Sequence, residues 1–334
     1  MEDKQKENEN YDARLQWSVC DKCNLSCEYC YNHPPKEKSI NILATIQLLF
    51  PKIKRNIEKI SKLSILEIMR IINQKIKEKT GKISDINISA LISTLDKTNK
   101  IFNICFTGGG EPFLVPNIIE ASAEITKKHY LTFVTNLTSK KIKELYEKID
   151  PQKVLWIIAS LHIKELERLD LLDVFIHNFL LCKEKGFNIE ALEVAYPKLF
   201  NEVEKYKEFF KKKGIELKFD RFRGVYNGKR YPDSYTQQEL KTFGIENSAD
   251  LKMSLSAQGK ICNAGYNVAA VCTTGDIHLC FHLPKNLGHI YKDIQFKNRL
   301  IKCPLEHCHC PFNVYDTYLF EKALKESQII ENNS

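Results

Sequence analysis

Four cysteines lie close together near the start of the chain, in the stretch CDKCNLSCEYC: Cys20, Cys23, Cys27 and Cys30. Read from Cys20, the stretch holds two CxxC pairs, a pattern typical of zinc sites. Structural zinc takes four tetrahedral ligands, and its paired motifs normally lie about a dozen or more residues apart. An iron–sulfur cube presents its irons on separate corners, so closely spaced cysteines can each hold a different iron. The CxxxCxxC spacing of the last three cysteines therefore favours a [4Fe–4S] cluster with one open iron.

A glycine-rich stretch follows the apolar run at residues 102–107. It reads FTGGGEPFL, residues 106–114, and carries Gly109, Gly110 and Glu111. Because glycine has no Cβ, it would let the backbone approach a bound ligand closely. We predict that this stretch and the cysteine loop both lie at the carboxyl ends of strands, where barrel enzymes carry their catalytic groups.

Together the two motifs resemble those of the radical S-adenosylmethionine (SAM) superfamily. CNLSCEYC is similar to the family's CxxxCxxC signature, including the aromatic Tyr29 before the last cysteine, and GGGEP is similar to its GGE motif. The resemblance implies that Cys23, Cys27 and Cys30 hold the cluster. It implies that the GGE residues, numbered 109–111 here, receive the methionine amino group of SAM. It also implies that Tyr29 lies against the adenine, with a core aromatic as the alternative.

The resemblance further implies a reaction. The open iron would be chelated by the amino and carboxylate groups of SAM, and a reductant such as flavodoxin or ferredoxin would supply one electron. That electron would break the sulfonium–C5′ bond, and the 5′-deoxyadenosyl radical would remove a hydrogen atom from the substrate. Asn136, Ser160 and His162 follow predicted strands and are candidate SAM contacts. A satisfied polar group at a strand end is the alternative for each.

Five further cysteines lie late in the chain: Cys262, Cys280, Cys303, Cys308 and Cys310. The first two flank Gly275 with the spacing CX12GX4C, which resembles the opening of the SPASM and twitch extensions of some radical SAM enzymes. The resemblance implies one auxiliary [4Fe–4S] cluster on the first two and on two of the last three. A zinc site at 303–310, with His307 or His309 among its ligands, is the alternative.

The remaining cysteines are predicted to be structural. Cys20 lies at the end of the first predicted strand, which favours a buried thiol. Cys105 and Cys182 fall in apolar runs, and Cys272 lies in a predicted hairpin. The chain holds 12 cysteines, and in a reducing compartment such a number indicates metal ligation rather than disulfides.

Six short apolar runs predict the strands that would position these groups: 15–19, 102–107, 131–135, 154–160, 189–195 and 215–221. Segments between them have apolar residues every three or four positions and predict helices, among them 115–129, 138–149 and 201–214. This alternation predicts an α/β fold with a parallel sheet, open or closed into a barrel. The family resemblance implies a partial (β/α)6 TIM-like barrel.

A change of pattern near residue 250 predicts a second, smaller domain. Turns and cysteines replace the helical pattern there, and residues 268–280 predict a hairpin. The predicted divisions are a disordered N-terminus (1–12), the barrel (13–240) with a helical insertion (41–100), an auxiliary-cluster domain with a C-terminal helix (250–326) and a polar tail (327–334).

Charge and hydropathy exclude some classes of binding partner. The net charge is +8, but 42 acidic residues are interspersed among 50 basic ones, so we do not expect direct nucleic-acid binding. No apolar run is long enough to span a membrane, and the N-terminus lacks the apolar region of a signal peptide. We therefore expect a cytoplasmic protein without a membrane partner.

The sequence leaves the substrate open. Residues 222–236 are rich in aromatics and arginine and are predicted to face it. Arg221 and Arg223 would bind a carboxylate or phosphate, or else form surface salt bridges. Auxiliary clusters in the family often serve oxidation of peptide or protein side chains, which makes such a substrate the first choice. A small molecule, such as a sugar or nucleobase derivative, is the alternative.

The short segment before the first predicted strand and the motifs themselves bear on the function. Barely a dozen residues precede the first predicted strand, so we expect a peptide substrate to dock on another surface or through a separate partner. Outside the radical SAM class, the alternatives are a non-catalytic iron–sulfur protein and a zinc-binding protein. An electron carrier would need neither GGGEP nor a barrel of this length.

Overall fold

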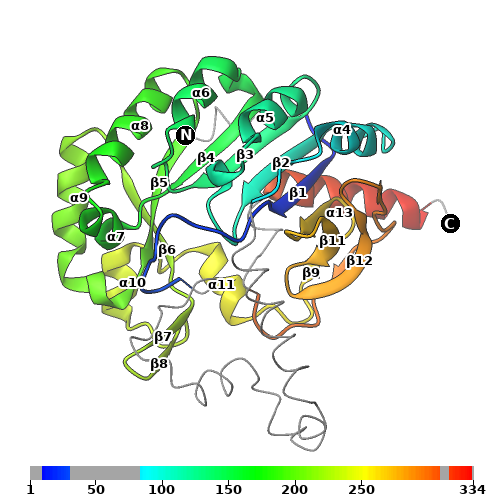
Figure 1. Cartoon of the computed structure of the whole chain (residues 1–334). Coiled ribbons are helices and arrows are strands. Elements are labelled where there is room, and N and C mark those ends of the chain that lie inside the picture. Colours follow the sequence, from blue (N-terminus) through cyan, green and yellow to red (C-terminus); the bar gives the residue numbers. More distant parts are fainter. Residues whose placement is uncertain (1–9, 31–82, 309–315, 333–334) are drawn as a thin grey trace, which may run out of the picture.

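The computed structural model describes residues 10–30, 83–308 and 316–332. At its centre, six strands run parallel in sequence order (Figure 1). They are β1 (Ala13–Ser18), β2 (Phe102–Thr107), β3 (Tyr130–Thr135), β4 (Val154–Ser160), β5 (Ile189–Ala195) and β6 (Leu217–Arg221). The predicted α/β fold, a partial barrel of six parallel strands with a hairpin extension, is confirmed.

The sheet has two unlike faces, because successive side chains on a strand point to opposite sides. Leu15 pairs with Ile104 on an apolar face, and both side chains are fully buried. On the other face, Thr132 Oγ1 donates to Asn103 Oδ1 at 3.0 Å. Such polar pairs satisfy hydrogen-bonding groups that are buried in the sheet.

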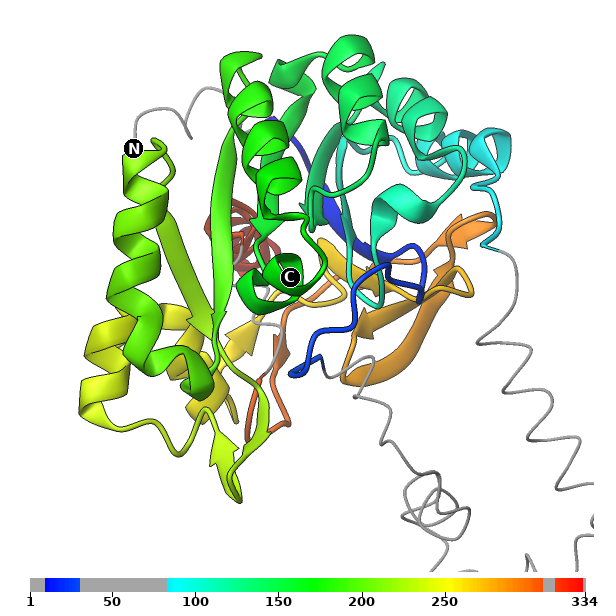
Figure 2. The same ribbon diagram turned by 60° about the vertical axis from the view of Figure 1, so that its left-hand side comes forward.

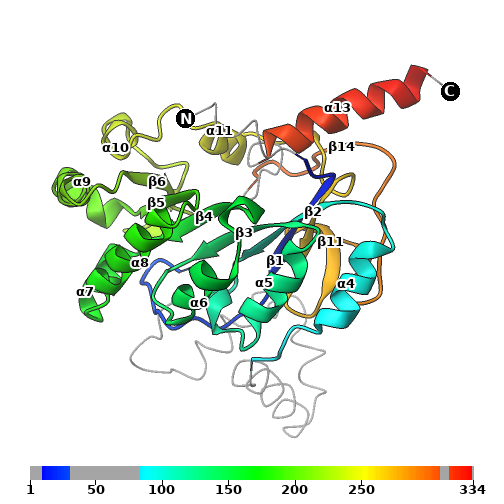
Figure 3. The same ribbon diagram turned by 90° about the horizontal axis from the view of Figure 1, so that it is seen from above.

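Helices connect the strands and pack along one side of the sheet, as α4, α5, α6 and α8 do in Figure 3. Two helices begin or end close to a proline or a glycine, the residues that typically mark helix boundaries. The helix α5 begins after Pro116, and Gly214, which follows α9, takes the left-handed φ of 75°. The helices and 3-10 turns are α4 (Ile88–Asp96), η4 (Pro112–Leu114), α5 (Ile118–Thr126), α6 (Lys141–Lys148), η5 (Pro151–Lys153), α7 (Ile163–Arg168), α8 (Leu172–Glu184), η6 (Pro197–Glu202) and α9 (Val203–Lys212). Of the predicted insertion at 41–100, residues 41–82 lie outside the described residues.

The late part of the chain extends the same sheet. The predicted hairpin at 268–280 is present as β10 (Val268–Val271) and β11 (Asp276–Cys280), followed by β12 (Leu283–His289) and β13 (Asp293–Ile294). Strand β10 pairs in parallel with β1, so the sheet has ten strands. In the hairpin turn, Gly275 has a φ of 92°, and a Cβ there would lie 2.7 Å from Cε1 of His289.

Smaller elements complete the described chain: β7 (Gly224–Tyr226), β8 (Lys229–Tyr231), α10 (Gln237–Phe243), α11 (Ala249–Leu255), β9 (Ile261–Cys262), β14 (Ile301–Lys302) and α13 (Thr317–Asn332). The strands β7 and β8 form one two-stranded sheet, and β9 and β14 form another. Within the described ranges, no helix has both the length and the apolar character needed to cross a bilayer.

The helix α13 docks at the start of β1. Asp316, just before the helix, accepts from the Tyr11 hydroxyl at 2.9 Å and pairs with Arg14 at 3.5 Å, while Lys322 donates to Asp12 at 2.8 Å. These contacts join the segment before β1 to the last described helix. The helix continues to residue 332, and no glycine or proline interrupts it.

Burial of His129 predicts a pH-dependent stability. Its Nδ1 accepts from the Phe102 N–H at 3.2 Å, and burial lowers its pKa from 6.5 to about 4. The unfolded chain therefore takes up a proton first, and stability is lost as the pH falls from about 6.5 towards 4. Linkage puts the loss at about 2 kcal/mol at pH 5. We expect His129→Asn, which can accept the same bond, to reduce the difference between urea unfolding free energies at pH 7 and pH 5. Equal differences in both proteins would contradict this.

Candidate functional site

The cysteine loop, residues 19–30, follows β1 and passes the carboxyl ends of the neighbouring strands. In Figure 1 it is the dark blue segment that leaves β1, and Figure 2 shows it from another side. Side chains and backbone groups from the ends of β2, β3, β4 and β5 each hold a different part of it.

The first anchor is the Gly-Gly-Glu turn after β2. The Glu111 N–H donates to the Lys22 carbonyl at 2.8 Å, and the Cys20 thiol donates to the Glu111 carbonyl at 3.2 Å. A Cβ on Gly110 would lie 1.9 Å from the Lys22 carbonyl oxygen, and one on Gly109 would lie 3.1 Å from that of Cys20. The close approach that these glycines permit is therefore to the backbone of the cysteine loop.

The Glu111 carboxylate joins the ends of β2 and β3. It is 2% exposed and accepts from the Thr135 hydroxyl at 2.7 Å, the Asn136 N–H at 2.8 Å and the Phe113 N–H at 3.1 Å. Burial raises its pKa, and these hydrogen bonds oppose that shift. The role of Glu111 as a SAM ligand stays a prediction.

The second anchor is at the end of β3. The Asn136 side-chain amide donates to Asn24 Oδ1 at 2.9 Å and lies 3.9 Å from the Cys23 sulfur. The Asn24 amide in turn donates to the Thr138 hydroxyl at 2.8 Å, and that hydroxyl donates to Asn136 Oδ1 at 2.7 Å. Asn136 therefore fixes the segment that carries Cys23, and its role as a SAM contact stays a prediction.

The third anchor lies at the ends of β4 and β5 and centres on Tyr29. Its hydroxyl donates to Glu193 Oε1 at 2.7 Å and lies 2.9 Å from His162 Nδ1. Glu193 is 1% exposed and also accepts from the Ile163 N–H at 2.6 Å. Burial lowers the pKa of His162 to about 4, so its ring is neutral near pH 7. Ser160 is half-buried at the end of β4.

Two further contacts hold the loop between the cysteines. The Ser26 N–H donates to Glu165 Oε1 at 2.7 Å, and Glu165 forms a two-pronged ion pair with Arg168. Glu28 accepts from the Tyr196 hydroxyl at 3.2 Å. The sequence analysis missed these anchors and Glu193. A glutamate inside the apolar strand 189–195 was the one signal that could have revealed part of this network.

The three cysteines of CxxxCxxC lie near one another on this anchored loop. Burial raises the pKa of Cys27, and the neighbouring thiols of Cys23 and Cys30 raise it further. Cys27 is buried, while Cys23 and Cys30 are partly exposed. Three thiols at this edge suit a [4Fe–4S] cluster, which takes one thiolate per iron. Cys20 is buried, and its thiol is directed to the backbone carbonyls of Lys22 and Glu111.

The late cysteines form a second group. Burial raises the pKa of Cys262 to about 12, and three neighbouring thiols add to the shift: Cys308, Cys280 and Cys303. The small β9–β14 sheet brings Cys262 opposite Ile301, and the Cys303 N–H donates to the Lys260 carbonyl at 2.9 Å. Cys310 and His309 lie outside the described residues, and His307 has a partly exposed side chain. In the described ranges, no three His, Cys, Asp or Glu side chains are arranged around the position of a single metal ion.

The other cysteines and arginines singled out in the sequence have partners of their own. Cys105 is fully buried beside Arg14, Cys182 is buried in α8, and the sulfur of Cys272 lies 3.4 Å from His278 Nδ1. Arg221 and Arg223 both pair with Asp220, at 3.1 and 3.6 Å.

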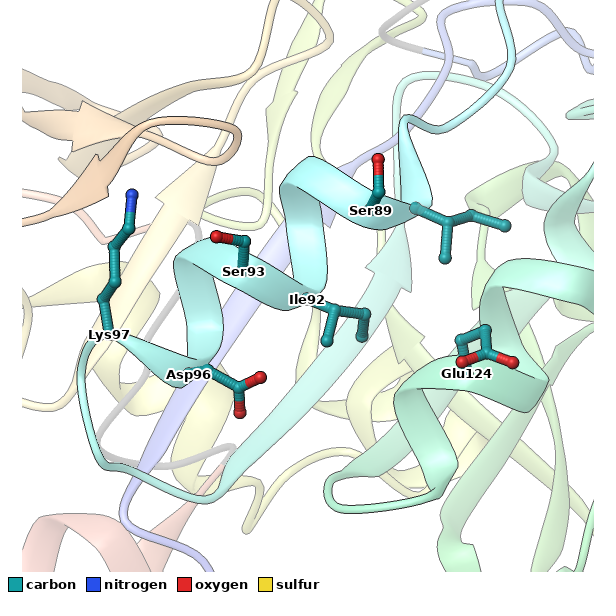
Figure 4. A pocket seen from close by; sticks show the side chains of 7 residues that line it. Ser89, Ile92, Ser93, Asp96, Lys97 and Glu124 are labelled. Atoms are coloured by element: carbon teal, nitrogen blue, oxygen red, sulfur yellow. The ribbon is translucent and has the colours of Figure 1, made fainter.

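The cavities in the described part of the chain include the following two. One of about 320 Å³ lies beside the cysteine loop, between Cys20, Thr274 and Tyr291. The other, of about 800 Å³, is an open groove between α4 and α5, lined by Ile92, Asp96 and other residues that Figure 4 shows. The groove is not lined by any residue of the cysteine loop.

Solved structures share this fold. Native anSMEcpe with bound AdoMet matches 95% of this chain and 99% of its own, with 16% identity and a TM-score of 0.52. Native anSMEcpe with bound AdoMet and Cp18Cys peptide matches the same shares, with 15% identity and a TM-score of 0.54. No model of a known protein family and no curated protein matches the sequence. The chain has the fold of radical SAM enzymes.

Replacement of Gly110 tests the contact between the turn and the loop. Gly110→Ala would place a methyl group 1.9 Å from the Lys22 carbonyl oxygen, so one backbone must move. We expect a loss of about 1–3 kcal/mol in unfolding free energy, the usual cost of overpacking. Urea unfolding measures it. Gly109→Ala is the matched control, with its nearest backbone atom at 3.1 Å, and a smaller loss is expected there. An equal effect of both variants would contradict the assignment.

Proposed function

We propose that this protein is a radical SAM enzyme. The observation that carries the proposal is the set of three neighbouring thiols, Cys23, Cys27 and Cys30, held on the Gly-Gly-Glu turn at the carboxyl ends of parallel strands. The fold is shared with anSMEcpe, whose solved structures hold AdoMet. These thiols would ligate a [4Fe–4S] cluster that, when reduced by a protein such as flavodoxin or ferredoxin, supplies the electron for cleavage of SAM.

The residues around the loop would position the cofactors rather than take part in the cleavage. Asn136 directs its amide toward the Cys23 sulfur, and Glu193 fixes Tyr29 between two cysteines. Gly109, Gly110 and Glu111 would bring backbone groups to the methionine part of SAM, with Ser160 and His162 as further contacts. The net reaction gives methionine, 5′-deoxyadenosine and a substrate that has lost a hydrogen atom.

We further propose an auxiliary [4Fe–4S] cluster on Cys262, Cys280, Cys303 and Cys308. The support is that these four thiols lie close together. Burial raises the pKa of Cys262, and the other three thiols raise it further. Four thiols would complete the ligation of a cube, so this cluster could not chelate SAM. It would accept the second electron when the substrate is oxidised.

A peptide or protein side chain is the substrate class that we favour. The comparison structure of anSMEcpe holds a Cp18Cys peptide together with AdoMet, and it covers 95% of this chain. Oxidation of a side chain removes two electrons and two protons. Cleavage of SAM accounts for one hydrogen atom, and the auxiliary cluster would take the remaining electron as a proton leaves.

Cysteine variants test the first cluster. We expect Cys23→Ala, Cys27→Ala and Cys30→Ala each to abolish release of 5′-deoxyadenosine from anaerobically reconstituted protein, because each loses a ligand. Cys20→Ala is the matched control on the same loop. It removes the thiol hydrogen bonds to the Lys22 and Glu111 carbonyls but no cluster ligand, so cleavage should persist. Loss of cleavage in Cys20→Ala with a normal iron content would contradict this assignment.

The auxiliary cluster is tested by iron content. A Cys262→Ala/Cys280→Ala protein should hold about four irons instead of about eight, following cube stoichiometry. Substrate-free SAM cleavage should survive and substrate oxidation should fail. Cys182→Ala, a buried thiol in α8, is the control and should keep the full iron content. A wild-type protein that never exceeds about four irons, or that takes up zinc at this site, would overturn the proposal.

A further inference from the structure

The β7–β8 hairpin stands apart from the main sheet. In the described part of the chain the two strands form a sheet of their own, and the hairpin projects beyond the end of β6 (Figures 1 and 2). Its turn residues, Asn227 and Gly228, have φ of 49° and 74°. Positive φ at both positions is the type I′ geometry that Asn-Gly favours. The turn fixes the register, with Val225 opposite Arg230.

One face of the hairpin is anchored near the cysteine loop. A Cβ on Gly224 would lie 2.7 Å from the Phe222 ring, so the strand packs directly on that ring. The rings of Tyr226 and Tyr196 are 5.1 Å apart, and the Tyr196 hydroxyl donates to Glu28 in the cysteine loop. Tyr196 therefore links the hairpin to the loop.

The exposed side chains of the hairpin include one apolar group and two cations. Val225 is 70% exposed, the highest value among the large hydrophobic residues described. Arg230 pairs with Val225 on the face opposite Tyr226, and Lys229 pairs with Tyr226 beside the turn. Both cations are exposed, and neither forms an ion pair with another described residue. An apolar side chain with one cation on its own face and a second cation at the turn suits a partner that is itself partly apolar and acidic.

The two edges of the hairpin differ. In a hairpin with a two-residue turn, the pair next to the turn, here Tyr226 and Lys229, is hydrogen-bonded. The next pair, Val225 and Arg230, is not, so its backbone N–H and C=O groups point away from the partner strand. On the β8 side, the Arg230 carbonyl accepts from the Ser234 N–H at 2.9 Å, and Pro232 has no N–H to offer. The outward groups of Val225 have no such bond within the described residues. The edge of β7 is therefore the open one.

We propose that the β7 edge binds an extended, acidic segment of a peptide substrate as a third strand. The segment would bond to the outward backbone groups of Val225 and place carboxylates within reach of Lys229 and Arg230. Peptides add to exposed sheet edges in this way, with backbone bonds supplying affinity and side chains supplying specificity. The inference rests on the proposed function, because it takes the substrate to be a peptide. Docking here would hold the peptide beside the loop that Tyr196 contacts.

Charge reversal tests the specificity. The probe is a fluorescein-labelled peptide of alternating glutamate and valine, titrated by anisotropy against the anaerobic holoenzyme, with a lysine–valine peptide alongside. We expect the acidic peptide to bind and Lys229→Glu/Arg230→Glu to weaken its binding about tenfold or more, since two attractive contacts become repulsive. The variant should gain affinity for the basic peptide. Lys211→Glu/Lys213→Glu, at the end of α9, is the matched control and should bind as wild type does.

A backbone change tests strand addition. Val225→Pro removes an outward N–H that the β7–β8 pairing does not use, and proline is tolerated at such an edge. We expect several-fold weaker binding of the acidic peptide, whereas Val225→Thr, which keeps the N–H, should bind normally. Unchanged binding in both the charge and proline variants would overturn the proposal. So would a charge variant that slows cluster reduction by flavodoxin but binds the peptide as before, because the surface would then serve the reductant.

The readouts separate this inference from the proposed function. Substrate-free 5′-deoxyadenosine release is measured on every variant and should equal that of wild type, because the hairpin holds no cluster ligand. If the wild type releases 5′-deoxyadenosine and all variants bind the peptide as the wild type does, the docking site alone is overturned. Absence of release from the wild type would overturn the proposed function alone, since peptide binding is read without turnover.

Discussion

The contact between two stretches of backbone, at Gly110 and Lys22, is the constraint on which the rest of the site depends. With no Cβ at position 110, the turn after β2 lies directly on the cysteine loop, and the Glu111 N–H bonds to the Lys22 carbonyl. This contact fixes the height of the loop above the sheet. Every later anchor then meets the loop at a set place, because the strand ends lie side by side in sequence order.

Two buried carboxylates make those later anchors rigid. Glu111 and Glu193 are almost fully buried, and each accepts hydrogen bonds from hydroxyl and backbone N–H groups of different elements. A buried carboxylate is costly unless its oxygens are satisfied, so displacing any one donor is unfavourable. Each glutamate therefore links the ends of neighbouring strands, and these links help to fix the positions of the cysteines.

Local pattern in the sequence predicted the six strands well, because each is a short apolar run followed by a helical period, and β2, β4 and β5 have the predicted bounds. The spacing of the cysteines and glycines also identified the residues that the fold brings together at one edge. The pairing of β10 with β1 could not be predicted, since strands more than 250 residues apart carry no local signal of each other. The anchors Asn24, Glu165 and Glu193 were hidden for the same reason: each is an ordinary polar residue until the fold supplies its partner.

The parallel pairing of β10 with β1 also determines the distance between the two groups of cysteines. The turn that precedes β11 lies beside the cysteine loop, where Thr274 and Cys20 line one cavity, and β11 then runs back along the sheet to Cys280. The two cysteine groups are thus separated by roughly one strand length, on the order of 15 Å for five residues. Hydrogen-bond register, rather than any side chain, sets the distance between the two groups of cysteines. A two-residue insertion in β11 would lengthen that gap without altering either group of cysteines.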